Sequence, residues 1–377
     1  MELDRLFCID RYGGPENFCD REAELSRLLE MFKLKRNGVL YAYRRLGKTG
    51  LVQHFHNKIG SDKKVITVYL DIMDTADDSE FVNKLVSACL MALEANKKGF
   101  IKQTLEFFGQ LRPSMTFDPI TNLPNIQLDI TTPTQVKLSL DALLNLLSKQ
   151  NYNFQIAIDE FQQIAKYESG TVIDATLRSF FNKAANIHYI FLDSERHLLL
   201  DLFKPDKPLF SAVEMMHLGY IPFEKYFEFI KKQFQRAKRS ITDDAIKEIL
   251  DWTNCHTFYT QYFCSKIIGT NKKKVNLALI EDIKNEILFQ YEVIYVNYKK
   301  LFRKIQWKVL VAIAKEGEVI EYTAKAFLNK YKLSQSSVNQ AVGTLVKKDM
   351  LIEKLSADKS RYMIYDVFLW RWAERYG

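Results

Sequence analysis

The sequence is poor in the residues that mark disulfide-rich and metal-binding proteins. Its 377 residues include 5 cysteines, an odd number with no Cys-x-x-Cys pair, so the spacing supports neither a disulfide framework nor a zinc site. The 6 histidines are scattered and form no His-Glu-x-x-His or similar ligand pattern. We therefore expect no metal centre built from protein ligands alone.

Long apolar runs and the composition of disordered chains are missing as well. No stretch reaches the roughly 18 consecutive apolar residues of a membrane-spanning helix. The amino-terminal segment MELDRLFCID also lacks the layout of a signal peptide. With only 8 prolines and 47% hydrophobic residues, the chain is expected to fold along its whole length, into two or three domains. We expect a cytoplasmic protein with no membrane partner.

One short stretch indicates phosphate binding. Residues 40–50 read LYAYRRLGKTG and fit the loop pattern G-x-x-x-x-G-K-[ST], except that Ala42 occupies the first glycine position. Alanine there carries a modest steric penalty, whereas a side chain at position 47 would collide with the phosphates. The candidate nucleotide-binding residues are Ala42, Arg44, Arg45, Leu46, Gly47, Lys48, Thr49 and Gly50.

The segments around this loop support the assignment. The apolar run NGVLYAY at 37–43 predicts a buried strand, and KTGLVQHFHNKIG at 48–60 places its apolar residues on one face of a helix. The amino terminus of such a helix presents N–H groups and a positive dipole to phosphates. The expected ligand is therefore ATP or ADP with Mg²⁺.

Further apolar runs predict an α/β fold, a parallel sheet covered by helices. Runs that read as buried strands alternate with helical stretches, which is typical of a doubly covered parallel sheet. The predicted strands lie at 63–72, 153–161, 186–194 and 214–221. The segment 112–130 holds two short alternating runs around DPITNLP and is predicted to be a β-hairpin insertion.

Two of these strands end in polar side chains suited to phosphoryl chemistry. Asp159 and Glu160 follow the apolar run IAI, as in a Walker B element, where one carboxylate serves the magnesium ion and the next polarises the attacking water. Ser194 ends the next strand at the same predicted sheet edge. It is either a sensor of the γ-phosphate or a helix cap. Arg178 and Arg196 are cations that either stabilise the transition state or form surface salt bridges.

Several segments in order resemble one family. ENFCDREAELSRLLE, YRRLGKTGLV, IAIDEFQQI, IFLDSERHLL and TNCHTFYTQYFC are similar to the motifs of the ATPase family first described from archaea and widespread in bacteria, within the AAA+ and STAND group of P-loop NTPases. The resemblance covers nearly the whole chain. It implies a P-loop ATPase domain at 1–221, a helical lid domain at 222–290 and a winged helix domain at 291–377.

The resemblance also implies roles for individual residues. Lys48 would hold the β- and γ-phosphates, Thr49 and Asp159 would bind magnesium, Glu160 would activate water, and Ser194 would be the first sensor. It further implies that the sensor strand lies between the loop strand and the Walker B strand. Phe18 and Arg21, in the family's F-x-G-R-E segment, would lie near the adenine.

The sequence departs from the family pattern at three places. Asp20 replaces the glycine of F-x-G-R-E, and NCHTFY at 254–259 replaces N-G-H-P-[YF]-Y in the lid. PLFSAV at 208–213 lacks the arginine that many relatives carry in a P-L-[YF]-G-R setting. This last departure implies slow turnover.

The carboxyl-terminal part, 291–377, reads as three helices followed by a two-stranded wing. It carries 16 Lys and Arg against 9 Asp and Glu, a formal charge of +7 out of the chain's +8. Such a basic domain either attracts DNA phosphates or serves as a protein-binding lobe. Two functions therefore remain: an ATP-hydrolysing switch, or a nucleotide-gated DNA- or protein-binding module with vestigial hydrolysis.

Overall fold

The computed structural model describes residues 6–97, 99, 108, 111–117, 124–194, 212–355 and 360–377. Over these residues the chain divides into two compact units. One unit comprises Gly14–Tyr220, and the other joins Met1–Gly13 to Ile221–Gly377. The expected three-domain division stays a prediction.

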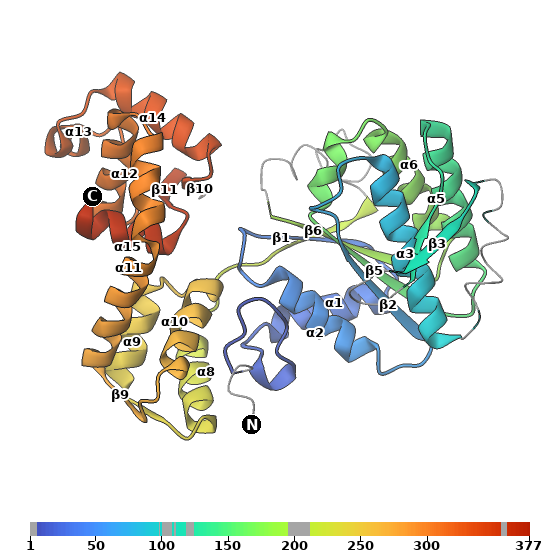
Figure 1. Cartoon of the computed structure of the whole chain (residues 1–377), viewed down its shortest axis with the longest axis horizontal. Coiled ribbons are helices and arrows are strands. Elements are labelled where there is room, and N and C mark those ends of the chain that lie inside the picture. Colours follow the sequence, from blue (N-terminus) through green and yellow to red (C-terminus); the bar gives the residue numbers. More distant parts are fainter. Residues whose placement is uncertain are drawn as a thin grey trace. The chain divides into compact units, whose positions relative to one another are not determined.

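The first unit is built on a five-stranded parallel sheet (Figure 1). Its strand order is β2-β5-β6-β1-β7, so the strand before Ser194 lies between the loop strand and the Walker B strand, as predicted. The strands are β1 (Gly38–Tyr41), β2 (Val65–Asp71), β5 (Asn153–Asp159), β6 (Ile187–Asp193) and β7 (Glu214–His217). All five were expected from their apolar runs. The α/β fold class is confirmed.

Helices cover both faces of this sheet because its strands are apolar on both faces. In β5, Ile156 and Ile158 pack on one side while Ala157, between them, packs on the other. One face is covered by α1 (Glu22–Lys33) and α2 (Lys48–Ile59). The other is covered by α3 (Asp78–Asn96), α5 (Pro133–Ser148) and α6 (Gly170–Lys183).

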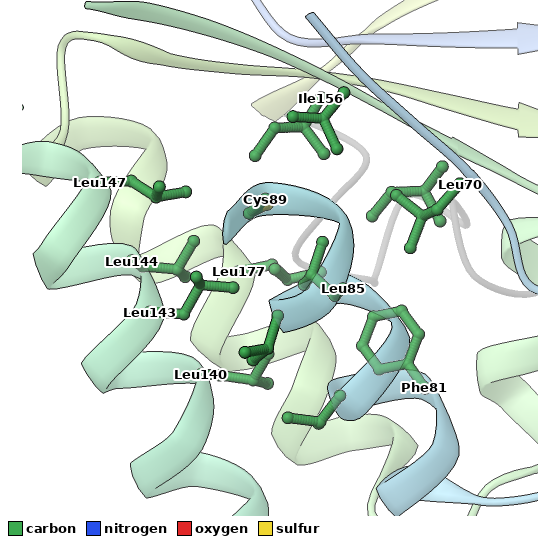
Figure 2. Close-up of a cluster of buried hydrophobic side chains, with 14 of the residues drawn as sticks. Leu70, Phe81, Leu85, Cys89, Leu140, Leu143, Leu144, Leu147, Ile156 and Leu177 are labelled. Atoms are coloured by element: carbon green, nitrogen blue, oxygen red, sulfur yellow. The ribbon is translucent and has the colours of Figure 1, made fainter. Parts of the chain in front are cut away.

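Figure 2 shows the buried apolar side chains through which these helices pack on the sheet. Phe81, Leu85 and Cys89 recur every four residues along α3 and form one apolar stripe that is fully buried. Leu140, Leu143, Leu144 and Leu147 form the matching stripe on α5. The two stripes meet the sheet around Ile156, so this core fixes β5 and the residues that follow it.

The predicted hairpin insertion is present. Strands β3 (Ser114–Phe117) and β4 (Pro124–Gln127) pair antiparallel. Ser87 on α3 exchanges two hydrogen bonds of 2.9 Å with the backbone of Ile126, which attaches the hairpin to the helix. Most of the expected DPITNLP turn lies outside the described residues.

The second unit begins with a helical part. Its elements are α8 (Phe223–Arg236), α9 (Asp243–Trp252), α10 (Thr257–Gly269), α11 (Leu277–Leu301) and the short strands β8 (Ser240–Ile241) and β9 (Lys274–Val275). Thr242 caps α9 through the backbone N–H of Ala245, as its position before two aspartates predicted. The boundary suggested between 290 and 291 falls inside α11, which runs without a break to Leu301.

The rest of this unit is the winged helix. Helices α12 (Lys304–Glu316), α13 (Lys325–Tyr331) and α14 (Gln335–Lys347) precede an antiparallel wing of β10 (Leu351–Leu355) and β11 (Ser360–Ile364). Ser334 caps α14, as expected. The last helix, α15 (Val367–Tyr376), was not predicted. Its Arg371 donates hydrogen bonds to the backbone oxygens of Asp251 (2.8 Å) and Trp252 (2.9 Å), and so ties α15 to α9.

Candidate active site

The loop between β1 and α2 has the backbone that its sequence requires. Gly47 adopts φ 96°, a left-handed conformation that costs an L-residue free energy, and it caps the amino terminus of α2. Arg45 also has a positive φ of 60°. The loop therefore turns sharply before α2, and the N–H groups in the first turn of a helix are suited to binding a phosphate.

The side chains of the predicted loop residues differ in what they can contact. Leu46 is 1% exposed and packs into the core below the loop, so it anchors the loop and leaves only its backbone to a ligand. Ala42 is also buried, and its carbonyl accepts a hydrogen bond of 3.3 Å from the Lys48 amine. Arg44 is half-buried and Arg45 exposed at the rim of the loop.

Lys48 is a buried cation facing carboxylates. Its side chain is only 6% exposed, and burial lowers the pKa of its amine. The charges of Asp159, Glu160 and Asp193 oppose that decrease in pKa. A buried ammonium group is stable only with anionic partners, so this position suits a lysine that contacts phosphate.

Thr49 and Asp159 lie in direct contact, although 110 residues separate them. The Thr49 hydroxyl donates to Asp159 Oδ2 over 2.8 Å, and the Glu160 backbone N–H donates to Oδ1 over 2.9 Å. The structure thus places the two predicted magnesium ligands side by side. A hydroxyl and a carboxylate suit Mg²⁺, which takes few protein ligands and fills its octahedron with water and phosphate oxygens.

Sequence reasoning missed a third group on Asp159. Tyr69 on β2 donates its hydroxyl to Asp159 Oδ2 over 2.6 Å. Burial and the Asp159 charge together raise the Tyr69 pKa far above its usual value, so the phenol keeps its proton. Tyr69 alternates with buried residues along a strand and reads there as a core aromatic, so no sequence signal distinguished it.

Glu160 and Ser194 also meet at this sheet edge. Ser194 donates its hydroxyl to Glu160 Oε2 over 2.6 Å, and Gln162 donates its amide to the same oxygen over 2.5 Å. Glu160 itself has φ 58°, a left-handed backbone that is strained for a residue other than glycine. The carboxylate is therefore held in one direction by two donors and by its own backbone. Gln162 was not predicted.

The amino-terminal candidates lie beside α2 and β7. The Phe18 ring stacks on His54 with centroids 4.5 Å apart, and it lies 3.5 Å from where a Cβ at Gly50 would be. Arg21 is 4% exposed and donates to the Gly219 carbonyl (2.7 Å) and to Glu24 (3.0 Å). These bonds give Arg21 a structural role, and contact of either residue with adenine stays a prediction.

The candidate arginines do not join the site in the described part of the chain. Arg178 lies near Asp174 on α6, with 3.6 Å between Nε and Oδ2, and lines a pocket with Asn37 and Glu214 at the amino ends of β1 and β7. The phosphate loop follows the opposite end of β1, so Arg178 lies away from it. Its pairing with Asp174 matches the salt bridge named above as the alternative role for this arginine. Arg196 and most of PLFSAV lie outside the described residues.

The motif NCHTFY at 254–259 spans the turn after α9 and the first residues of α10. Asn254 and Cys255 both have positive φ values, 53° and 51°. The family's glycine at position 255 would adopt this conformation without strain, whereas cysteine adopts it at some cost. His256 then precedes the first residue of α10.

Comparison with known families assigns most of the chain to two family models. Residues 18–259, more than half of the chain, match the model of a family described as "ATPase domain predominantly from Archaea". The chain belongs to this family. Residues 275–375 match a second model, described as "Probable winged helix domain". A search among curated proteins found no match.

Solved structures share the fold at low sequence identity. A Walker-type ATPase of Pyrococcus abyssi is 18% identical, with 98% of this chain and 99% of that chain covered and a TM-score of 0.64. The ORC2 protein of Aeropyrum pernix, in ADPNP-ADP complexes, is 12% identical over 98% and 96% of the two chains, with a TM-score of 0.60. The ORC1 protein of the same organism, in complex with DNA, is 13% identical over 98% and 95%, with a TM-score of 0.54. These similarities show that the chain shares the fold of these proteins.

No helix among the described residues is both long and apolar enough to cross a membrane.

Proposed function

We propose that this protein is an ATP-hydrolysing molecular switch of the AAA+ and STAND type. The proposal rests chiefly on one arrangement: the Thr49–Asp159 pair and the Glu160–Ser194 pair are held at the same edge of the sheet, next to the Gly47 loop. Membership in an ATPase family and the ADP- and ADPNP-bound ORC2 neighbour support it.

In the proposed reaction each residue has one task. The Lys48 ammonium binds the β- and γ-phosphate oxygens and offsets their charge. Thr49 and Asp159 hold Mg²⁺, which when bound would neutralise charge on the transferred phosphoryl group. Glu160 accepts a proton from the attacking water, and Ser194 orients that carboxylate.

The binding step is tested by Lys48→Ala in the full-length protein. Calorimetric titration with Mg-ATP should show binding to the parent and none to the variant, because the variant loses the buried ammonium group that faces Asp159 and Glu160. Lys35→Ala, at the amino end of β1, removes a lysine from the same unit and should leave affinity unchanged. Equal ATP affinity of the parent and Lys48→Ala would overturn the site assignment.

A second candidate function is a nucleotide-gated DNA-binding module with vestigial hydrolysis. The observation that favours it is the basic winged helix, whose α14 exposes Gln335, Ser336, Asn339 and Gln340, together with the DNA-bound ORC1 neighbour. Fluorescence anisotropy with duplex DNA should then show affinity that falls steeply with salt. Replacing the exposed Lys347 and Lys348 should flatten the slope of log affinity against log salt by up to about two. If the protein shows no salt-dependent binding, the DNA-binding function is excluded and a protein partner is favoured.

A further inference from the structure

The winged helix carries a groove that the nucleotide site does not explain. Its volume is about 620 Å³, and it lies over α12, the end of α11 and the end of α13. Aromatic and aliphatic side chains form its floor, and lysines form its rim. The floor residues are Phe302, Trp307, Val311, Ala312 and Tyr331, and the rim lysines are Lys299, Lys304, Lys308 and Lys315. Gly377 also lines the groove and lies beside Val311.

The lining arises from the spacing of α12. Lys304, Lys308, Val311 and Lys315 follow one another at intervals of four, three and four residues, which places them along one face of the helix. Trp307 and Ala312 flank this line and are buried. One helix face therefore combines exposed cations with an apolar surface, an arrangement that suits an amphipathic anion.

Two features of the groove lining lack partners among the described residues. The Trp307 side chain is 7% exposed, and its indole N–H is buried without a hydrogen-bond partner among the described residues. A buried donor of this kind is costly unless it finds an acceptor. Lys299, Lys304 and Lys315 form no ion pair within the part of the chain that the structure describes.

Of the charged groups near the groove, Lys348 adds positive charge, whereas Lys330 and Glu316 pair with each other. Lys348 lies over the Phe302 ring at 5.2 Å, and Lys330 lies over the Tyr331 ring at 5.5 Å. The neighbouring carboxylate of Glu316 is occupied by Lys330 at 2.7 Å and by the Tyr331 hydroxyl at 2.6 Å. The groove itself is lined by four lysines and by no aspartate or glutamate side chain.

We propose that this groove binds an acidic peptide segment of a partner protein, with a large apolar side chain inserted over its apolar floor. The rise of an α-helix places Lys304 and Lys315 about 16 Å apart. One small anion cannot pair with both lysines, whereas about five residues of extended chain span that distance. The apolar floor distinguishes this surface from the polar face of α14, where DNA phosphates and base edges would be met.

The proposed partner makes two kinds of contact with the groove. Carboxylates of the peptide pair with the rim lysines, which steers the encounter and sets specificity. The apolar side chain removes the floor from water and supplies most of the affinity. None of these contacts requires the nucleotide site, so this proposal stands or fails separately from the proposed ATPase function.

Selection from a peptide library tests the proposal. The full-length protein is presented with displayed nonapeptides randomised at all nine positions, in buffer at physiological ionic strength. The expected result is enrichment of a central Phe, Trp, Leu or Ile flanked by Asp or Glu. No enrichment, or enrichment of acidic residues without an apolar centre, would overturn the proposal.

Variants then locate the binding of the enriched peptide. Lys304→Glu combined with Lys315→Glu should weaken it about tenfold or more, because attraction becomes repulsion at both ends of the groove. Lys272→Glu combined with Lys273→Glu makes the same charge change at exposed positions outside the groove and should have little effect. Equal loss in both pairs, or full displacement of the peptide by duplex DNA with no dependence on the apolar centre, would show non-specific electrostatic binding and contradict the proposal.

Discussion

Ser194 and Glu160 form a direct hydrogen bond, 2.6 Å from Oγ to Oε2, between the ends of two neighbouring strands. The alternative role for Ser194 was a helix cap, and the residues that such a cap would serve lie outside the described part of the chain. The observed bond favours a role in orienting Glu160. The two roles predict different outcomes when the hydroxyl is removed.

We expect Ser194→Ala to lower kcat for ATP hydrolysis roughly tenfold while nucleotide affinity stays within about twofold, because an oriented carboxylate loses one of its donors. Steady-state kinetics and calorimetry on the same preparation measure both. Ser61→Ala removes a hydroxyl at the far end of α2 and is the matched control. If Ser194→Ala loses thermal stability but keeps the parental kcat, the cap role is correct.

Tyr69→Phe should raise the Mg²⁺ concentration needed for half-maximal hydrolysis by about tenfold. The Tyr69 hydroxyl fixes the Asp159 carboxylate, and groups that orient a metal ligand commonly contribute at this level. Tyr189→Phe is a suitable control, since its buried hydroxyl on β6 forms no hydrogen bond within the described residues. If Tyr69→Phe needs the same Mg²⁺ concentration as the parent, Asp159 does not act as a magnesium ligand.

Stability should fall in mild acid because of a buried histidine. Burial lowers the pKa of His56 to about 4, against 6.5 for an exposed imidazole. The unfolded chain therefore takes up the proton first. The stability from this residue is fully present above about pH 6.5 and is lost as the pH falls toward 4. Between pH 7 and pH 5 we expect a loss of about 2 kcal/mol from His56 alone.

Urea denaturation of the parent and of His56→Met at pH 7 and pH 5 measures how much of the lost unfolding free energy is due to His56. The variant has no group to titrate at position 56, so its loss between pH 7 and pH 5 should be smaller than the parent's by about 2 kcal/mol. His188, whose pKa burial also lowers to about 4, remains in both proteins and keeps part of the acid sensitivity. Identical pH dependence in parent and variant would show that His56 is not buried as a neutral imidazole.

Sequence patterns predicted the sheet and the pairs at its edge because these features leave strong local signals. A parallel strand buried on both faces is a continuous apolar run, and the carboxyl ends of such strands meet at one edge, so Asp159, Glu160 and Ser194 could be placed together. Tyr69 and Gln162 could not be predicted. Each resembles an ordinary strand or turn residue, and only the packing of β2 beside β5 brings Tyr69 to Asp159.

The carboxyl-terminal half was less predictable for a related reason. Helix α11 runs from Leu277 to Leu301 and so continues past residue 290. No Gly or Pro in the sequence marks a boundary there, so there was no signal for its true end. Helix α15 is short and aromatic, so its sequence FLWRWAERY suits a strand as well as a helix until Asp366 is seen to cap it. The groove at Trp307 depends on three helices and has no signal in any one segment.

The most direct test of the account is the fate of bound ATP in Glu160→Gln. Glutamine preserves the shape of the side chain but cannot accept a proton from water, so the variant should bind Mg-ATP as tightly as the parent and leave it unhydrolysed. Chromatography of the nucleotide released from each protein after a fixed incubation gives the answer. The account predicts ADP from the parent and intact ATP from Glu160→Gln, whereas ADP formed at the parental rate by the variant would contradict it.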